Sequence, residues 1–295
     1  MNEAAIVYRS AVRASCEERA LMLTAIGIRV EVVHGTRECG LLVDSEDAPR
    51  ARNELARYEA ENSGWRRPLR EPLPRRSTGR PGVLAYTGVL LAFAICQTQA
   101  LFGFPWLDAG RIDAGLVRDG EWWRVITALT LHVDTGHLIG NLGFGAAFGW
   151  FAGQLLGSGL AWASILIAGG LGNLLNVWVQ TDAHRAVGAS TAVFGALGLV
   201  AAFAWVHRRG SGDRWAYRWA PLVAGAVLLT WFGTGDENTD IVAHLTGFVS
   251  GVALGALFGA GLPWLPGSAR CQQIAAAAGA ALLGGAWMTA LLAGA

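Results

Sequence analysis

The chain has 295 residues, of which 53% are hydrophobic and only 15% are charged, whereas ordinary soluble domains carry about 25% charged residues. This composition predicts a polytopic membrane protein rather than a soluble globular one. The net charge of +1, with no basic run interleaved with aromatic residues, gives no reason to expect a nucleic-acid partner.

The basic residues are distributed unevenly along the chain. All 23 are arginines, and 14 of them precede residue 81. This asymmetry divides the chain into a polar head and an apolar body. Because the first 20 residues lack the basic tip and apolar run of a secretory signal, we expect the head to stay on the cytoplasmic side of the membrane.

Residues 1–62 are predicted to form a small cytosolic α+β domain. The pattern reads as a strand, a helix, a hairpin and a second helix, in the order βαββα. The second helix is expected over residues 48–61, capped by Asp47 and with Pro49 in its first turn. Regulation or partner docking is the expected role. Residues 63–82 are rich in arginine and proline and predict a linker at the membrane surface.

The four cysteines are widely scattered and include no C-x-x-C pair. Their spacing suggests neither a zinc site nor a disulfide framework. We therefore expect free thiols at all four positions, which are Cys16, Cys39, Cys96 and Cys271.

Seven windows are long and apolar enough to cross a bilayer, for which about 20 residues are needed. They cover residues 83–102, 137–156, 159–179, 189–206, 219–233, 240–260 and 273–293. The first six form a predicted core over residues 83–260, and residues 261–295 supply a loop and the seventh span. The arginine-rich loop "HRRGSGDRWAYR" lies on the same predicted side as the head, as the positive-inside rule requires. The N-terminus is then cytoplasmic and the C-terminus outside, in what we expect to be a bacterial inner membrane.

Polar residues inside spans are rare, and they indicate function by default. Four of them lie near the outer ends of the predicted spans, namely His137, Asn141, Ser190 and His244. Below them run stripes of small residues, such as Gly247, Gly251 and Gly255 in the sixth span. Such stripes let helices approach closely, so we expect the fourth and sixth spans to bring His244 against Ser190. The Phe194 ring, one turn below Ser190, is expected to pack on the imidazole.

Four segments together resemble the rhomboid family of intramembrane serine proteases. They are "GEWWRVITALTLH" in the long first loop, "HLIGN" opening the second span, "GAST...FGALG" opening the fourth and "AHLTG" in the sixth. They cover about residues 120–260 in the family's order. The resemblance implies an all-α polytopic fold with a six-helix core and one additional C-terminal transmembrane helix.

The resemblance also implies a catalytic dyad. Ser190 takes the place of the nucleophile in the G-x-S motif that Gly188 begins, and His244 takes that of the general base in the A-H-x-x-G motif that Gly247 completes. His137 and Asn141 fall where the family places its oxyanion-stabilising side chains, with the backbone N–H of Ser190 as a further donor. Trp123 and Arg124 match a structural pair of the first loop.

Two positions depart from the family pattern. Thr191 stands where the common motif has glycine, and its β-branched side chain must fit between the fourth and sixth spans. Thr191 is also an alternative reactive hydroxyl, although the glycine register favours Ser190. Phe194 stands where tyrosine is frequent, which keeps the ring and loses the hydroxyl.

The expected function is hydrolysis of transmembrane segments of other membrane proteins within the bilayer, with no metal or cofactor. Two site alternatives remain: Asp240 as a third triad member or simply as a helix cap, and a metal site formed by His132, Asp134 and His137, whose spacing matches no standard zinc motif. Two other function classes also remain. One is a non-catalytic rhomboid-like protein that binds membrane clients, and the other is a transporter, which the scarcity of acidic residues in the spans disfavours.

Overall fold

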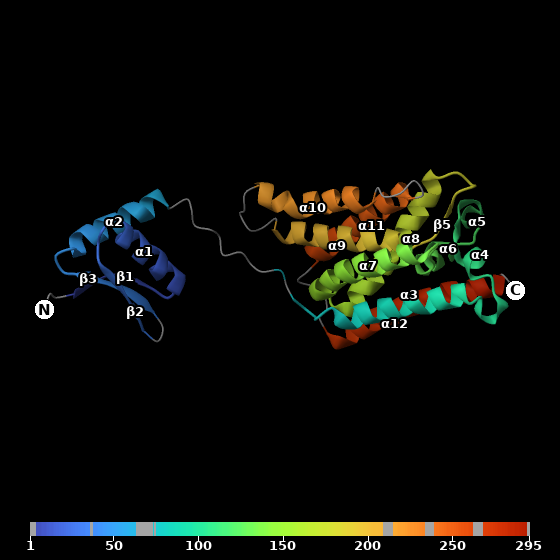
Figure 1. The fold of residues 1–295 in the computed structure, drawn as a ribbon, viewed down its shortest axis with the longest axis horizontal. Helices are drawn as coiled ribbons and strands as arrows, with labels where there is room; N and C mark the ends of the chain where they lie inside the picture. Colours follow the sequence, from blue (N-terminus) through green and yellow to red (C-terminus); the bar gives the residue numbers. More distant parts are fainter. Residues whose placement is uncertain are drawn as a thin grey trace. The chain divides into compact units, whose positions relative to one another are not determined.

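The protein is described from a computed structural model. The structure describes residues 4–35, 38–62, 73, 75–208, 215–233, 239–261 and 268–293. It divides into two compact units, Met1–Leu69 and Arg70–Ala295, and each is treated by itself (Figure 1).

The N-terminal unit is a three-stranded antiparallel sheet with two helices. Its sheet order is β1-β3-β2, so the last strand lies between the first two. The elements are β1 (Ala4–Ser10), α1 (Arg13–Ala25), β2 (Val30–His34), β3 (Cys39–Asp44) and α2 (Ala48–Glu61).

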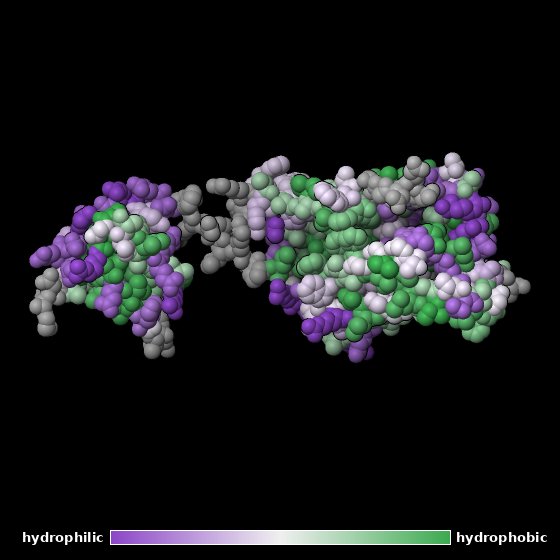
Figure 2. Space-filling view, in the orientation of Figure 1, coloured by the Kyte–Doolittle hydropathy of each residue, from purple (hydrophilic) through white to green (hydrophobic). Residues whose placement is uncertain are grey.

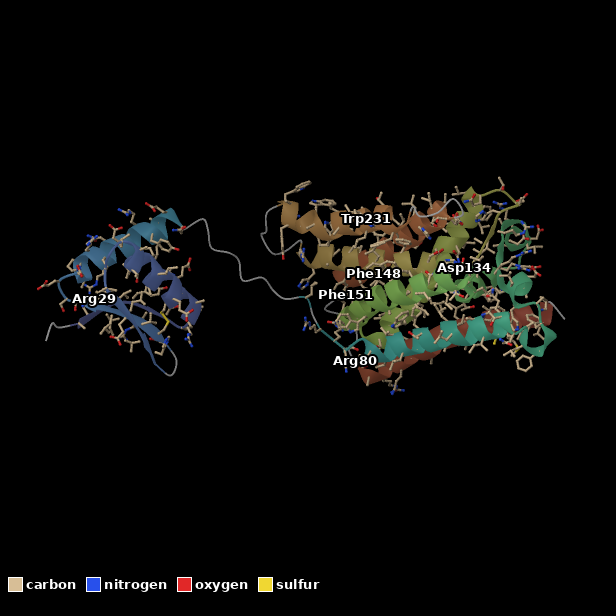
Figure 3. The ribbon with its side chains drawn as sticks, in the orientation of Figure 1. Arg29, Arg80, Asp134, Phe148, Phe151 and Trp231 are labelled. Carbon is tan, nitrogen blue, oxygen red and sulfur yellow. A yellow bond between two sulfur atoms is a disulfide. The ribbon has the colours of Figure 1, made fainter. Side chains whose placement is uncertain are left out.

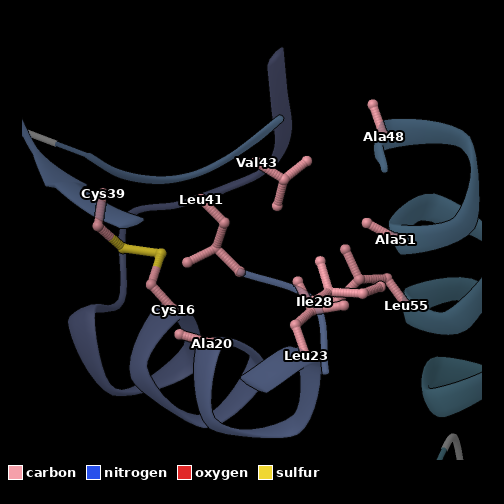
Figure 4. Packing of buried hydrophobic residues seen from close by; sticks show 10 residues of the cluster. All are labelled: Cys16, Ala20, Leu23, Ile28, Cys39, Leu41, Val43, Ala48, Ala51 and Leu55. Carbon is pink, nitrogen blue, oxygen red and sulfur yellow. A yellow bond between two sulfur atoms is a disulfide. The ribbon is translucent and has the colours of Figure 1, made fainter. Parts of the chain in front are cut away.

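One face of the central strand builds the core of this unit. Cys39, Leu41 and Val43 alternate with half-buried neighbours along β3, as the period of two in a strand requires. Leu23 of α1 and Leu55 of α2 pack against the same cluster (Figure 4). Asp47 is the N-cap residue of α2 and Pro49 lies in the first turn, as expected, but among the described residues the Asp47 side chain makes no capping hydrogen bond.

The expectation of four free cysteines is wrong for two of them. Cys16 of α1 and Cys39 of β3 form a disulfide across 23 residues of sequence, as Figure 4 shows. Spacing along the chain did not indicate the pair, because the sheet and the helix bring the two positions together only in the folded unit. Cys96 and Cys271 are free thiols.

The second unit is built from long helices whose axes run roughly alongside one another (Figure 1). The long helices of its described residues are α3 (Arg80–Thr98), α7 (Thr135–Leu156), α8 (Ser158–Val179), α9 (Ser190–Arg208), α10 (Trp215–Gly233), α11 (Ile241–Ala260) and α12 (Ala269–Ala293). By length and composition α3, α8, α9, α11 and α12 are able to cross a membrane. Figure 2 shows apolar surface over the long helices. The multi-pass membrane architecture is thereby confirmed.

A chain of short elements joins α3 to α7. They are η1 (Leu101–Gly103), α4 (Trp106–Gly110), β4 (Ile112–Asp113), α5 (Ala114–Arg118), α6 (Arg124–Thr127) and η2 (Ala128–Thr130). β4 pairs with β5 (Arg185–Ala186), which leads from α8 into α9. Figure 2 shows hydrophilic surface at the end of the unit that carries α5.

Glycine contacts hold α9 and α11 together, as the stripes predicted. A side-chain carbon at Gly251 would lie 1.9 Å from the carbonyl oxygen of Gly195, and one at Gly255 would lie 2.2 Å from that of Leu199. On the other face of the contact, a carbon at Gly198 would lie 2.2 Å from the carbonyl oxygen of Phe248. The two backbones approach this closely because no side chain separates them.

Candidate active site

The first turns of three helices meet at one end of the second unit. α7, α9 and α11 begin at Thr135, Ser190 and Ile241, at the end that also carries the short elements between α3 and α7 (Figure 1). In Figure 3, Asp134 marks this end of α7 and Arg80 marks the opposite end, where α3 begins. His137, Asn141, Ser190 and His244 all lie within the first two turns of their helices.

Ser190 begins α9 and is half-buried. The segment before it is fixed by a hydrogen bond from the Gly188 N–H to the Ala128 carbonyl oxygen, 3.0 Å long. Gly188 has φ of +134°, a conformation that favours glycine. The first N–H groups of a helix have no partner within it and carry partial positive charge, so the start of α9 provides donors next to the Ser190 hydroxyl.

The imidazole of His137 covers the segment that leads to Ser190. A side-chain carbon at position 188 would lie 2.6 Å from Cε1 and 2.7 Å from Nε2 of His137, and 3.6 Å from Oγ of Ser190. His137 therefore occupies the space that a side chain at Gly188 would need, on the side of the Ser190 hydroxyl. Asp134 caps α7 by accepting the N–H of His137 at 2.8 Å.

A second histidine supports this ring from behind. His132, which is buried, meets His137 edge to face, with ring centroids 5.1 Å apart. Gln97 of α3 holds the backbone of His132 in both directions, donating to its carbonyl oxygen at 2.7 Å and accepting its N–H at 3.3 Å. Burial, and secondarily the neighbouring His137, lower the pKa of His132 to about 4, so this imidazole is neutral at physiological pH.

Asn141 lies one turn below His137 and is buried. Its side-chain amide donates to the carbonyl oxygen of His137 at 3.0 Å. The backbone carbonyl oxygen of Asn141 accepts the hydroxyl of Tyr86 at 2.8 Å. An asparagine amide has two N–H donors, so this intrahelical bond still leaves one of them for another acceptor.

His244 lies in the first turn of α11 and is buried. The Phe194 ring of α9 packs on its imidazole with centroids 4.5 Å apart, as expected from the sequence. Because Phe194 and Ser190 are four residues apart on α9, their side chains lie on the same side of that helix. The geometry thus brings His244 to the face of α9 that carries Ser190.

Thr191 is accommodated by glycines on two neighbouring helices. Its Cγ2 methyl would lie 2.8 Å from a side-chain carbon at Gly172 of α8 and 2.9 Å from one at Gly247 of α11. The threonine is buried. The side chain of Thr191 therefore fits because Gly172 and Gly247 have none, and Gly247 is a packing partner of Thr191.

Arg124 anchors the segment before α7, as the resemblance implied for this position. The buried guanidinium donates to Glu121 at 2.6 Å and to the carbonyl oxygens of Asp108 and Arg111 at 2.7 and 2.9 Å. These bonds tie α4 and α6 together, so Arg124 has a structural role.

Asp240 accepts hydrogen bonds that link three segments. One carboxylate oxygen caps α11 by accepting the Ala243 N–H at 2.9 Å. The other lies 2.7 Å from Nδ2 of Asn176 and 2.8 Å from Nε2 of His184. The sequence offered the cap as one of two alternatives for Asp240, and it indicated neither Asn176 nor His184 as a partner. Asn176 could have been found, since it is an amide within a predicted span, whereas His184 in a loop gives no such signal.

The second unit is similar to known proteins. The Rhomboid domain family matches residues 119–261. Rhomboid protease GluP of Bacillus subtilis is 28% identical over 167 residues, which is 55% of this chain and 30% of that protein. Rhomboid-like protease 1 of Toxoplasma gondii is 31% identical over 48% of this chain and 49% of its own length. Putative rhomboid protease YdcA of B. subtilis is 29% identical, over 48% of this chain and 69% of that protein.

The chain thus spans from less than a third to about half of the length of the first two of these relatives. The matched region contains the starts of α7, α9 and α11, where the polar side chains meet. The family match, the relatives and the multi-pass architecture all indicate a rhomboid-like membrane protein. Over residues 119–261 the chain is therefore similar to the rhomboid family.

Proposed function

We propose that this protein is an intramembrane serine endopeptidase that cleaves transmembrane segments of other membrane proteins. The observation that carries the proposal is the meeting of three helix starts, with His137 over Gly188 beside Ser190 and with Phe194 of α9 on the His244 ring. Nucleophile, base and hydrogen-bond donors in one place are what acyl transfer requires.

In the proposed reaction the Oγ atom of Ser190 attacks the scissile carbonyl carbon while His244 takes the hydroxyl proton. The carbonyl oxygen becomes an oxyanion, which the Ser190 N–H, Asn141 and His137 stabilise. His244 then gives the proton to the leaving amine, and the peptide bond breaks to leave an acyl-enzyme. Water then attacks the ester while His244 removes its proton. The bond between the acyl carbon and Oγ of Ser190 breaks, His244 returns the proton to Oγ, and the new carboxyl end leaves.

The substrate is proposed to be a membrane-spanning segment that unwinds locally. In a helix the backbone groups are hydrogen-bonded to one another, so a carbonyl becomes open to attack only where the helix is interrupted. The dyad needs no metal ion or cofactor. The nucleophilic oxygen of the dyad belongs to Ser190, which begins α9 and is half-buried.

The protease proposal is tested with purified protein in liposomes, using a transmembrane reporter and a fluorophosphonate probe. We expect wild type to cleave the reporter and to be labelled, and Ser190→Ala to lose both activities. Ser164→Ala is the matched control, because Ser164 is a buried helix serine that donates to its own helix at Leu160. If the wild-type protein neither cleaves the reporter nor reacts with the probe, the proposal is wrong and a non-catalytic client-binding protein is favoured.

Thr191 is the competing hydroxyl, and Thr191→Gly separates the two. If Ser190 is the nucleophile, the glycine variant keeps probe labelling. If labelling follows Thr191 instead, Thr191→Gly abolishes it and Ser190→Ala does not. The rate of Thr191→Gly relative to wild type also reports whether the threonine limits turnover through its contact with Gly247.

We further propose that the N-terminal unit is cytoplasmic and that the site opens on the opposite side of the membrane. The concentration of arginines before residue 81 supports this orientation. Cytosolic thiols are kept reduced, whereas disulfides persist in oxidising compartments. The state of Cys16 and Cys39 in intact cells therefore tests the orientation, since a cytoplasmic unit presents the pair as thiols after rapid acid quenching and alkylation.

A further inference from the structure

Two polar residues outside the proposed dyad connect its two halves. His184 lies six residues before Ser190, in the segment that joins α8 to α9, and Asp240 lies four residues before His244. The Nε2 atom of His184 is 2.8 Å from Oδ2 of Asp240. A carboxylate oxygen only accepts, so Nε2 carries the proton and donates it into this bond.

The same carboxylate reaches two further elements. Its Oδ2 atom accepts Nδ2 of Asn176 at 2.7 Å, and Asn176 is fully buried in the last turn of α8. Its Oδ1 atom accepts the Ala243 N–H at 2.9 Å and so caps α11. One aspartate therefore joins the end of α8, the segment before Ser190 and the start of α11.

The backbone of Asp240, whose carboxylate is anchored in this way, bonds directly to the backbone of His244. The His244 N–H donates to the carbonyl oxygen of Asp240 at 3.1 Å, so the position of Asp240 fixes the first turn of α11. On the other side, β5 directly follows His184 and pairs with β4. If the segment before Ser190 moved relative to the start of α11, the bond between His184 and Asp240 would break.

We infer that Asp240, His184 and Asn176 form a positioning bridge that sets His244 in register with Ser190. None of the three is a catalytic residue, because each acts through the backbone of a helix or loop. The inference rests on the proposed function, since it assigns the bridge to the Ser190 and His244 pair. The close packing of α9 on α11 fixes the middle of the two helices, and the bridge fixes their active ends.

The test separates bridging from capping. His184→Ala removes the donor and leaves the cap of α11 in place. Asp240→Ser keeps a side-chain oxygen of the kind that caps helices but is too short to reach His184 and Asn176. Thr181→Ala is the matched control, because Thr181 is exposed in the same segment. His184→Gln is the conservative variant, because its amide can still donate.

Loss of a hydrogen bond to a charged group predicts a fall in kcat of about 10-fold or more for His184→Ala and Asp240→Ser. We expect KM to stay within about twofold, since the bridge does not contact substrate, and labelling of Ser190 to slow in parallel with kcat. The double variant should lose no more than the worse single variant, because both remove one bridge. His184→Gln should recover most of the activity, and Thr181→Ala should equal wild type.

Hydrogen exchange provides a readout that does not depend on activity. We expect His184→Ala to speed exchange in the first turns of α11, residues 241–247, although the substitution lies in another segment. If exchange there and kcat both match wild type, or if the two single losses simply add, the bridge is overturned. If wild type neither cleaves nor labels, the proposed function fails, and exchange in His184→Ala still decides whether the bridge holds α11.

Discussion

The two units of this chain are stabilised in opposite ways. In the N-terminal unit, large apolar side chains such as Leu23 and Leu41 are wholly removed from water. In the helical unit, the closest contacts are made where side chains are missing, as at Gly195 and Gly251. Burial from water supplies the driving force in the first case. Inside a bilayer that force is absent between helices, so close backbone packing and polar bonds take its place.

The largest effect is expected from removing a buried side chain in the N-terminal unit. Leu41→Ala deletes apolar contacts at the centre of β3 and should lower the free energy of unfolding of that unit by about 2–5 kcal/mol. Hydrogen exchange of the β1 to β3 amides in the full chain measures it. Leu21→Ala is the control, since Leu21 is 73% exposed on α1. Equal losses in both variants would mean that burial does not stabilise this unit.

The disulfide between Cys16 and Cys39 should contribute nearly as much to the free energy of unfolding of the N-terminal unit, and only when it is formed. Cys16→Ser opens a bridge across 23 residues, for which loop closure predicts a loss of about 3 kcal/mol. The loss should be seen in oxidising buffer and should largely disappear in reducing buffer, where wild type is opened as well. Cys96→Ser in α3 is the control, because Cys96 is a free thiol. A loss that persists in reductant would mean that packing of the sulfur, not the bond, stabilises the unit.

In the helical unit, adding a side chain rather than removing one should lower stability. Gly251→Ala adds one methyl group that would lie 1.9 Å from the carbonyl oxygen of Gly195, and overpacking of this kind lowers stability by about 1–3 kcal/mol. Thermal unfolding in detergent, read with the rate of reporter cleavage, measures the effect. Gly284→Ala in α12 is the matched control, because nothing lies within 4 Å of a side-chain carbon there, and alanine favours a helix by about 1 kcal/mol over glycine. If both variants behave alike, close approach of α9 and α11 does not stabilise the core.

At neutral pH the smallest effect is expected from His132, because its titration changes stability only below about pH 6.5. The pKa of its buried imidazole is lowered from 6.5 to about 4 in the folded protein, so the unfolded chain binds the proton more readily between these values. The contribution of His132 to stability should therefore be constant above about pH 6.5 and fall as the pH drops toward 4. The His132→Phe variant should show a shallower fall in melting temperature over this window. His34→Phe, an exposed position in the N-terminal unit, should leave the profile unchanged; a profile identical in wild type and His132→Phe would contradict the assignment.

Local pattern was sufficient for much of the fold. The apolar windows corresponded to long helices, and the glycine stripe of α11 did mark a close contact with α9. Helical spacing, together with the expected contact of the fourth and sixth spans, placed Phe194 against His244, and the structure agrees. These features are set by residues a few positions apart, and helical periodicity converts such spacing into a face.

Other features required the folded chain. The Cys16 and Cys39 pair was invisible to spacing, and the partners of Asp240 lie 56 and 64 residues away from it. Gln97, which holds His132, reaches it from 35 residues away. Nothing in a local window reports which distant donor will meet a given acceptor.

The sequence by itself determined the membrane-spanning character, the resemblance to the rhomboid family and the residues proposed for catalysis, because composition and short motifs are local properties of the chain. Only the tertiary structure decided how these residues are held. It set Thr191 against Gly172 and Gly247, His137 over Gly188, and Asp240 between Asn176 and His184. Those contacts depend on how closely helices approach and which of their turns meet, and packing between segments far apart in sequence fixes both.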